Sequence, residues 1–415
     1  MSRERSMASG STGSTGSDDL LAGLRVLELG SFIAAPSAGR LLADFGADVV
    51  KVERPGTGDE LRRWRLHEGD TSLLFRVMNR NKRSVTLDLR TDEGRELCLD
   101  LIRSCDVVLE NFRPGTLERW GLGPEEIRRV NPRAVLVRIS GYGQSGPYRD
   151  RPGFGGVAEA LGGLRHLTGY PDRAPTRVGI SIADQIAGLY AVIGALMALH
   201  RRDRDGRGET VDVALYEGIY SLMESLVPDY DAFGVERGRT GSALPGVVPS
   251  NTYRCADGKY AVISGNGDAI YRRLMRLVGR PDLAEDPALA DNAGRVARAD
   301  ELDEAIGTWT ATLPCSDVLR ALEQAAVPGG PIYTASDILD DPHYRARGMH
   351  ERHPVAVASG DKAEVVFPGV VPRFEDRPGT TRWLGPDLGE HTDDVLDSLG
   401  VGAARRERLR AQGVL

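Results

Sequence analysis

The stretch LRVLELGSFIAAPSAGRLLADFGADVVKVE, residues 24–53, decides the fold class of this chain. Residues 24–29 form an apolar run that ends in Gly30 and Ser31, which predicts a strand followed by a turn. Residues 36–45 have a proline in their first turn and Gly46 after their last residue, as expected of a helix. Residues 47–53 are again strand-like, so the stretch is predicted to be a β-α-β unit.

The same alternation continues through the first half of the chain. Further strands are expected at 84–89, 106–112, 134–140 and 210–215, and helices at 92–104, 182–202 and 216–231. This order predicts an α/β fold, a Rossmann-like, doubly wound parallel sheet with helices on both faces. The helix at 182–202 is apolar on nearly every face and is expected to be buried in a core or an interface.

A stretch rich in Gly and Pro at 238–249 separates this part from the next. Residues 251–334 carry strands at 251–255, 259–265 and 331–333 with two or three amphipathic helices, which predicts a smaller α+β domain. A strand region at 365–374 and a short helix pair follow. The expected domains are a disordered tail, a large domain, a small domain and a C-terminal segment, at 1–20, 21–237, 238–336 and 337–415.

Composition excludes several classes of protein. The chain has 415 residues and a net charge of −7, so it lacks the positive field of a general nucleic-acid binder. Its four cysteines show no C-x-x-C spacing and are interpreted as reduced thiols. Neither a run of about 18 apolar residues nor a signal-peptide core is present. We therefore expect a cytoplasmic protein without a membrane or nucleic-acid partner.

Common catalytic motifs are also missing. The first β-α-β unit has Gly30 and then no glycine until Gly39, so it lacks G-x-G-x-x-G, and Glu53 is not expected to bind a nicotinamide ribose. Neither G-x-S-x-G nor a Walker A loop occurs. His350 and His353 have no third ligand nearby and are read as part of a solvated loop, so no metal site is predicted.

Arginine placement indicates a ligand. Arg54, Arg90 and Arg113 each lie just beyond a predicted strand. Ligands of open α/β sheets bind at the carboxyl ends of strands, and guanidinium groups match phosphate oxygens in pairs. Any one of these arginines is more often a surface charge, but together they predict a phosphorylated ligand.

Asp184 allows two interpretations. Ser181 and Asp184 have the spacing of a capping box at the start of the helix from 182, and the residue types alone favour capping by about three to one. The alternative is a carboxylate nucleophile aimed into a cavity. The remainder of the chain has to decide between them.

Several motifs in order resemble the family III CoA-transferases, the group that includes formyl-CoA and carnitine CoA-transferases. The resemblance extends from about Leu21 to the C-terminus. Its motifs are LAGLRVLELGSFIAAPSAGRLLADFGADVVKVERPGTGD, NRNKRSVTLDL, DVVLENFRPG, GYGQSGPY and GRGETVDVALYE, at 21–59, 79–89, 106–115, 141–148 and 206–217. It implies an interlocked dimer of two open rings, in which the C-terminal segment returns to the large domain.

The resemblance also implies roles for residues. Asp184 matches the family's covalent nucleophile. The positions that hold CoA correspond to Ile33, Ala34, Arg54, the run from Leu87 to Arg90, the run Asn111, Phe112 and Arg113, and Arg119. The active-site loops correspond to Phe154, Gly155 and Gly156 and to the loop around Gly246, whose backbone N–H groups are candidate oxyanion donors.

The implied activity is transfer of CoA from an acyl-CoA, succinyl-CoA by resemblance, to a small carboxylic or dicarboxylic acid. CoA then acts as a substrate, with no tightly bound cofactor. Arg165, Arg177 and Arg239 are open candidates for binding a distal carboxylate. The GFGG stretch at 153–156 lacks the His-Asp pair of the racemase branch. An acyl-CoA racemase or isomerase and a non-catalytic CoA-binding protein remain the alternatives.

Overall fold

The structure is a computed structural model that describes residues 18–68, 71–356 and 362–415. By its internal contacts the chain divides into two compact units. The sheet unit comprises the chain up to Gly162, Ile180–Leu222 and Gly348–Leu415, and the second unit comprises Gly163–Gly179 and Met223–Arg347. The domain boundaries predicted at residues 20, 237 and 336 stay predictions.

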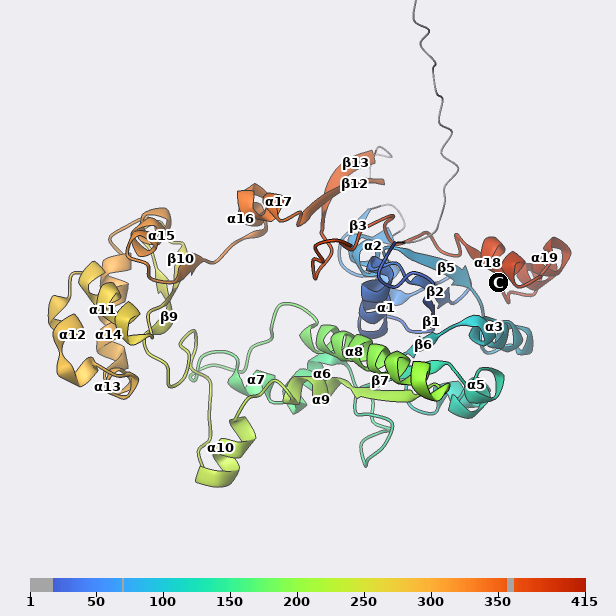
Figure 1. The fold of residues 1–415 in the computed structure, drawn as a ribbon, viewed down its shortest axis with the longest axis horizontal. Coiled ribbons are helices and arrows are strands. Elements are labelled where there is room, and N and C mark those ends of the chain that lie inside the picture. Colours follow the sequence, from blue (N-terminus) through green and yellow to red (C-terminus); the bar gives the residue numbers. More distant parts are fainter. Residues whose placement is uncertain (1–17, 69–70, 357–361) are drawn as a thin grey trace, which may run out of the picture. The chain divides into compact units, whose positions relative to one another are not determined.

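A six-stranded sheet forms the centre of the sheet unit (Figure 1). Its order is β5-β2-β1-β6-β7-β8 and every neighbouring pair is parallel, as predicted. The strands are β1 (Arg25–Glu28), β2 (Asp48–Glu53), β5 (Lys82–Thr86), β6 (Val107–Glu110), β7 (Val135–Ser140) and β8 (Thr210–Ala214). The chain leaves β1 toward β2 and β5, and β6 begins the other half of the sheet. The loops after β1 and after β6 therefore run in opposite directions along the sheet. Open α/β sheets bind ligands at such a point, where the strand order reverses.

Helices cover both faces of this sheet, because side chains alternate between faces along each strand. On one face, α3 (Asp92–Ser104), α5 (Pro124–Val130), α18 (Thr392–Ser398) and α19 (Ala403–Ala411) share an apolar core with residues such as Leu27 and Val50. On the other face lie α1 (Ala34–Asp44) and α8 (Ile182–Asp205), which pack on each other and on the strands. Shorter elements of this unit are η1 (Glu60–Arg63), β3 (His67–Glu68), β4 (Thr71–Ser72), α2 (Leu73–Met78), α4 (Thr116–Arg119), α6 (Gly155–Leu161) and α9 (Leu215–Tyr220).

Helix α8 is long and apolar enough to cross a membrane by length and composition. In the structure it instead packs against α1 and β7. Gly188 permits this close approach, because a Cβ there would overlap the Ser37 hydroxyl on α1. The helix is therefore a core element of the sheet unit along one of its faces.

The C-terminal segment returns to the β5 edge of the sheet. The Trp383 indole donates to Lys82 O at 2.8 Å, and His391 N donates to Ser84 O at 2.9 Å. The predicted helix pair of this segment is present as α18 and α19. These contacts bring residues of the C-terminal segment next to β5, the edge strand that pairs with β2, although the two are more than 300 positions apart in the chain.

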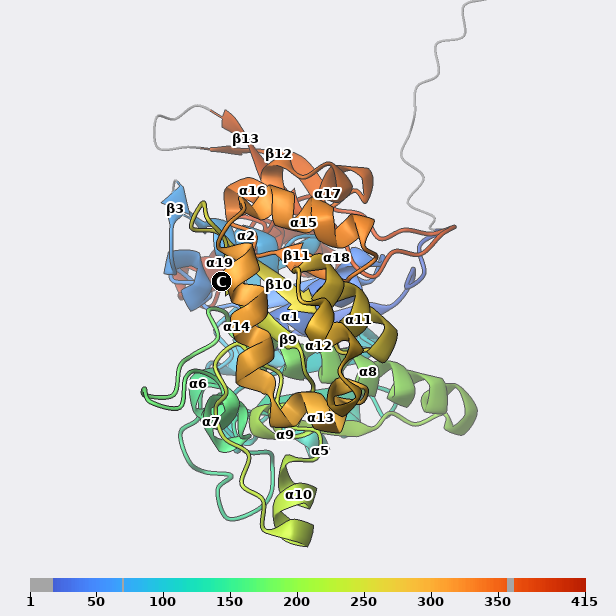
Figure 2. The same cartoon turned by 90° about the vertical axis from the view of Figure 1, so that its left-hand side faces the viewer.

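The second unit has a three-stranded antiparallel sheet in the order β11-β10-β9. Helices α11–α15 pack around it, with Tyr271, Leu274 and Ile306 in the core (Figure 2). The bounds are β9 (Ser250–Arg254), β10 (Tyr260–Ser264), α11 (Asp268–Leu277), α12 (Pro281–Glu285), η2 (Pro287–Leu289), α13 (Asn292–Ala297), α14 (Ala299–Thr310), α15 (Cys315–Gln324) and β11 (Gly329–Pro331). The prediction of two or three helices was too low, because Pro281, Pro287 and the Asp291 cap divide the helical region.

This unit also contains α7 (Leu164–Leu167), α10 (Leu226–Phe233), α16 (Ala335–Asp340) and α17 (Pro342–Ala346). The helix predicted at 216–231 is wrong, because α9 ends at Tyr220 and α10 begins at Leu226. Glu224 between them has φ 51°, a left-handed conformation that interrupts a helix.

The solvated loop predicted around His350 and His353 is also wrong. These residues belong to β12 (His350–Ala356), which pairs antiparallel with β13 (Lys362–Pro368) in the sheet unit. The apolar run at 365–367 needs a partner strand, and β12 supplies it.

Candidate active site

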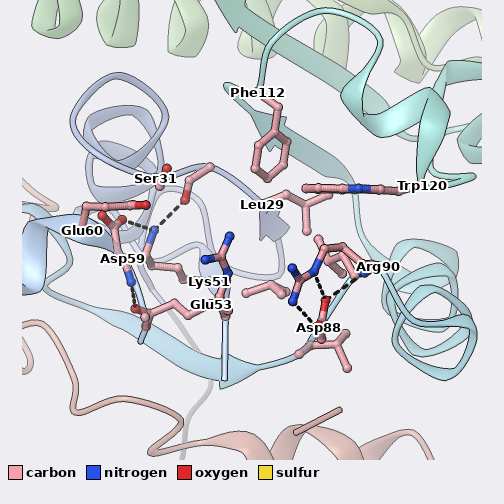
Figure 3. Close-up of a pocket in the computed structure, with 16 residues that line it drawn as sticks. Leu29, Ser31, Lys51, Glu53, Asp59, Glu60, Asp88, Arg90, Phe112 and Trp120 are labelled. Carbon is pink, nitrogen blue, oxygen red and sulfur yellow. Dashed lines mark hydrogen bonds and ion pairs between the residues drawn. The ribbon is translucent and has the colours of Figure 1, made fainter. Parts of the chain in front are cut away.

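A cavity of about 130 Å³ lies at the carboxyl ends of β1, β2, β5 and β6 (Figure 3). This is the position that the divergence of loops between β1 and β6 favours for a ligand. Its lining combines charged, aliphatic and aromatic residues: Leu29, Gly30, Ser31, Lys51, Val52, Glu53, Arg54, Gly58, Asp59, Glu60, Leu87, Asp88, Leu89, Arg90, Phe112 and Trp120.

Two arginines at the rim provide positive charge. The Arg54 side chain is exposed and makes no hydrogen bond or ion pair with any other residue in the described ranges. Arg90 forms a fork with Asp88, with Nε to Oδ1 at 2.8 Å and Nη2 to Oδ2 at 2.6 Å. This hydrogen bonding by Arg90 lowers the pKa of Asp88, and the charge of Arg54 lowers it further. A phosphate at this rim would find Arg54 available to pair with it.

Another part of the cavity lining is apolar. Phe112 and Trp120 pack edge to face, with ring centroids 5.0 Å apart, and both line the cavity. The buried side chains of Leu29 and Leu87 contribute aliphatic surface beside them. A cavity lined by aromatic and aliphatic side chains as well as guanidinium groups suits a planar base that carries phosphates.

A buried ionic cluster adjoins the cavity, and three of its members, Lys51, Glu53 and Asp59, line it. The cluster contains three carboxylates and three cations, Glu28, Glu53, Asp59, Lys51, Lys82 and Arg62. Lys51 Nζ lies 2.9 Å from Glu28 Oε1 and 2.8 Å from Asp59 Oδ2, and Lys82 Nζ lies 2.7 Å from Glu28 Oε2. Equal numbers of opposite charges make this burial possible.

Glu53 has no capacity left for a ligand. Its carboxylate accepts hydrogen bonds from Arg62 Nε and Nη2, both at 2.8 Å, from Ser84 Oγ at 2.6 Å and from Asp59 N at 3.0 Å. A carboxylate has about four acceptor positions, and all are used. Glu53 therefore holds the loop that contains Asp59 and Arg62, in agreement with the expectation that it does not bind a ribose.

The pKa values follow from this enclosure. Burial alone would raise the pKa of Glu28, but Lys51 and Lys82 bring it below its ordinary value. Burial likewise opposes ionisation of Glu53, whose pKa is lowered by hydrogen bonds from Arg62 and by the charge of Lys51. Burial would lower the pKa of Lys51, but Asp59, Glu28 and Glu53 raise it. Burial, together with repulsion from Lys51, lowers the pKa of Lys82 to about 8 despite Glu28.

The predicted CoA-binding residues divide into two groups. Arg54, Leu87, Arg90 and Phe112 line the cavity. The other five do not line it. Ile33 packs in a core with Leu61, Phe75 and Met78, and Ala34 is buried at the start of α1. Asn111 forms hydrogen bonds with the Ser31 backbone, Arg119 donates to the Thr116 hydroxyl, and Arg113 is exposed.

Asp184 lies in the first turn of α8, and the capping box expected with Ser181 is not formed. Ser181 is the N-cap residue, but its side chain makes no capping hydrogen bond in the described structure. The Asp184 side chain is partly buried and lies against Gly155, where a Cβ would overlap Oδ2. The missing side chain at residue 155 therefore makes room for this carboxylate.

An aromatic row connects the surroundings of Asp184 with the cavity. Phe154, which is 63% exposed, packs edge to face on Phe32 with ring centroids 5.9 Å apart. Phe32 in turn lies 5.2 Å from the Trp64 ring and follows Gly30 and Ser31 of the cavity wall. The loop after β1 thus touches both the cavity and the residue that precedes Gly155.

The remaining candidates lie in other places. Gly156 is the second residue of α6. Gly246 belongs to the second unit, where its φ is 71° and its carbonyl accepts a bond from Asn292 at 2.8 Å. The second unit also contains the three candidates for binding a distal carboxylate, Arg165, Arg177 and Arg239. Of these, Arg239 donates to the carbonyls of Tyr170 and His166. No group of three or more His, Cys, Asp or Glu that could hold a metal occurs in the described ranges.

Sequence reasoning missed Trp64, Trp120 and the ionic cluster. One signal for the cluster was present, because Lys51 and Lys82 are two of only four lysines among 53 basic residues. Lysine is a compact point charge, unlike the forked guanidinium of arginine, and suits a narrow buried position.

Comparison with known proteins identifies relatives over nearly the whole chain. The family model described as CoA-transferase family III matches residues 21–392. A succinyl-CoA–D-citramalate CoA-transferase of Chloroflexus aurantiacus is 48% identical over 395 residues, covering 94% of this chain and 97% of that protein. A succinyl-CoA:mesaconate CoA-transferase of Haloarcula hispanica is 37% identical over 390 residues, covering 91% and 96%. The crystal structure of a CAIB/BAIF family protein from Brucella suis matches with a TM-score of 0.82 at 36% identity, covering 92% of this chain and all of that one.

Proposed function

The chain belongs to CoA-transferase family III, and we propose that it transfers CoA from succinyl-CoA to a small dicarboxylic acid through covalent intermediates on Asp184. The similar proteins named for citramalate and mesaconate support this substrate class. The observation that carries the role of Asp184 is its position against Gly155 in the same unit as the cavity.

The proposed reaction has four acyl transfers. A carboxylate oxygen of Asp184 attacks the thioester carbonyl of succinyl-CoA, the C–S bond breaks, and a succinyl-aspartyl anhydride and CoA thiolate form. The thiolate attacks the aspartyl carbonyl, which releases succinate and leaves an aspartyl-CoA thioester. The acceptor carboxylate attacks this thioester to give a second anhydride and thiolate. The thiolate then attacks the acceptor acyl carbon, which regenerates Asp184 and releases the new acyl-CoA.

The residues around Asp184 suit this chemistry. The N–H groups of Gly155 and Gly156 lie in the first turn of α6, where helix donors have no partner within the helix. They are the proposed donors to the oxyanions that develop at each carbonyl. Phe32 and Phe154 supply apolar surface beside Gly155, which would help exclude water from the anhydrides. Arg54 is the proposed partner of a CoA phosphate.

Mass spectrometry of enzyme trapped during turnover tests the nucleophile. Wild-type protein incubated with succinyl-CoA should carry a CoA adduct on the peptide that contains Asp184. Asp184→Ala should lose the adduct and lower transfer by about 10³-fold or more, because nothing else supplies the covalent step. Asp203→Asn, on an exposed carboxylate near the other end of α8, is the matched control and should keep both. Retained transfer in Asp184→Ala, or an adduct elsewhere, would contradict the proposal.

We also propose that two copies form the interlocked dimer that the resemblance implies. Helix α8 exposes apolar side chains at Leu189, Ile193, Leu196 and Met197; Ile193 is four residues from Leu189 and from Met197 and three from Leu196, so they gather on one side of the helix. Such a row is suited to burial by a second copy. Light scattering should give twice the mass of one 44.9 kDa chain, and a monomer at micromolar concentration would contradict this.

A further inference from the structure

Lys51 is a cation in the wall of a cavity that we assign to CoA, so the obvious role for it is phosphate binding. Its contacts indicate another role. The side chain is 1% exposed, and Nζ donates to Gly30 O at 2.7 Å and to Glu28 Oε1 at 2.9 Å. Its third contact is the ion pair with Asp59 Oδ2 at 2.8 Å. Two of the three ammonium donors are therefore used in hydrogen bonds, and the Asp59 carboxylate lies against the same ammonium, so this buried cation is already neutralised by protein oxygens and is poorly placed to pair with a phosphate.

The contacts of Lys51 are part of a clamp on the loop after β1. Three consecutive residues of that loop are each held by a buried or half-buried side chain. Lys51 holds the Gly30 carbonyl. Asn111 accepts from Ser31 N at 2.9 Å and donates to Ser31 O at 2.7 Å. Asp59 Oδ1 accepts from Phe32 N at 3.1 Å, while its other oxygen pairs with Lys51.

The loop needs such support because Phe32 has φ 62°, a left-handed conformation that is unfavourable for a bulky residue. This conformation carries the Phe32 ring to Trp64 and Phe154. Phe154 immediately precedes Gly155, against which Asp184 lies. A change in the loop would therefore affect the position of Asp184 through two contacts, Phe32 with Phe154 and Gly155 with Asp184.

We propose that Lys51, together with Asp59 and Asn111, is a positioning residue that holds residues 30–32 and so the aromatic surface beside Asp184. Phosphate binding at the end of β2 then falls to Arg54, three residues along the chain, exposed and without a partner in the described ranges. The proposal rests on the proposed function where it concerns the rate of reaction at Asp184, and its binding part is independent of that function.

The experiment compares a charge-balanced double variant with a variant of Arg54. Lys51→Met with Asp59→Asn removes one charge of each sign, so the cluster keeps two carboxylates and two cations. We expect its Kd for CoA, measured by calorimetry, to stay within about threefold of wild type. The rate of aspartyl-CoA formation at saturating succinyl-CoA, measured by rapid quench and mass spectrometry per CoA-binding site, should fall by about 10²-fold, because small misplacements of reacting groups have effects of that size.

Arg54→Met should behave in the opposite way. Its Kd for CoA should rise about tenfold or more, as expected for one lost charge-assisted contact, while the saturated rate of adduct formation stays within about threefold of wild type. A merely structural role for Lys51 would lower thermal stability and leave the saturated rate per binding site unchanged. That result would overturn the proposal.

Asn111→Ala is the second variant, because it removes the two bonds to Ser31 without touching a charge. It should lower the saturated rate by about tenfold and leave the Kd for CoA unchanged. If the double variant does not fold, this variant tests the proposal on its own. A tenfold weaker Kd for CoA in the Lys51 variant, or wild-type rates in both clamp variants, would overturn the proposal. Absence of an Asp184 adduct in wild type would instead refute the proposed function, and the binding comparison of Lys51 with Arg54 would still test the clamp.

Discussion

Two carboxylates of the sheet unit lie against glycines but have different surroundings. Glu28 lies against Gly39 of α1, and Asp184 lies against Gly155 of α6; in each case a Cβ on the glycine would overlap a carboxylate oxygen. Glu28 is completely buried, and its two oxygens accept bonds from Lys51 and Lys82. Asp184 is partly exposed at the start of a helix.

The difference shows that the position of a carboxylate and its ability to react are determined by separate features of the fold. A glycine fixes where the carboxylate lies by allowing a close approach that any side chain would prevent. Counter-charges and burial then decide whether the carboxylate can react. Glu28 is neutralised by two ammonium groups and acts as a structural anion, whereas Asp184 has the exposure that a nucleophile needs.

The largest effect, a loss of stability, should come from removing the buried carboxylate, Glu28. Glu28→Ala leaves Lys51 and Lys82 buried with one carboxylate fewer, and removing one partner of a buried ion pair costs about 3–5 kcal/mol. Urea unfolding followed by circular dichroism measures the loss. Glu96→Ala, on an exposed position of α3, is the control and should change stability by no more than about 0.5 kcal/mol. Equal stability of the two variants would contradict a stabilising role for Glu28.

The next effect concerns Gly155, against which the Asp184 carboxylate lies. Gly155→Ala forces the carboxylate to move, and we expect kcat to fall by about 10²-fold with little change in the Kd for CoA. Steady-state kinetics and calorimetry measure the two quantities. Gly307→Ala is the control, because its Cβ would meet only Tyr253 Cδ1, at 3.9 Å, and activity should not change.

Gly39→Ala completes the comparison. Its Cβ would press on Glu28, so it should lower stability more than activity, the reverse of Gly155→Ala. If both glycine variants lost mainly stability, the proposed distinction between a structural and a reactive carboxylate would be wrong.

How far the sequence predicts the molecule depends on whether a signal is local. The β-α-β order is local, since each strand and helix shows its own apolar pattern and stop residue, and the parallel sheet followed from it. Because strand ends converge at one edge, Arg54 and Arg90 could be placed at a common cavity. Interruption of the helix expected at 216–231 depends on the backbone of Glu224, which no pattern indicates.

The ionic cluster and the seat of Asp184 could not be predicted for a different reason. Glu28 meets Lys51 because these residues are directly opposite in the pairing of β1 with β2, and register is a property of the assembled sheet. Gly155 and Asp184 are 29 residues apart and meet only when α6 and α8 pack. The family resemblance gave Asp184 a role but did not show why residue 155 has to be small.

The smallest effect is a dependence of stability on acid pH that belongs to the buried cluster. The folded state holds the pKa values of Glu28 and Glu53 below the ordinary value of 4.5, despite burial, through their lysine and arginine partners. Above pH 4.5 both states are ionised and the full stabilisation is present. Below it the unfolded chain takes up protons first, so stability falls by up to about 1.4 kcal/mol per pH unit for each carboxylate until the folded pKa is reached.

Urea unfolding between pH 6 and pH 3 measures this slope. Glu28→Gln cannot take up the proton and should reduce the slope by up to about 1.4 kcal/mol per pH unit relative to wild type. The cations respond in the alkaline range with opposite signs. Between pH 8 and 10.5 the folded state has released the Lys82 proton that the unfolded chain still holds, so this group makes stability rise with pH, whereas Lys51 opposes unfolding until the pH exceeds 10.5. An acid slope unaffected by Glu28→Gln would mean that the pKa of Glu28 is the same in the folded and unfolded states, which would contradict the stabilisation of its charge by Lys51 and Lys82.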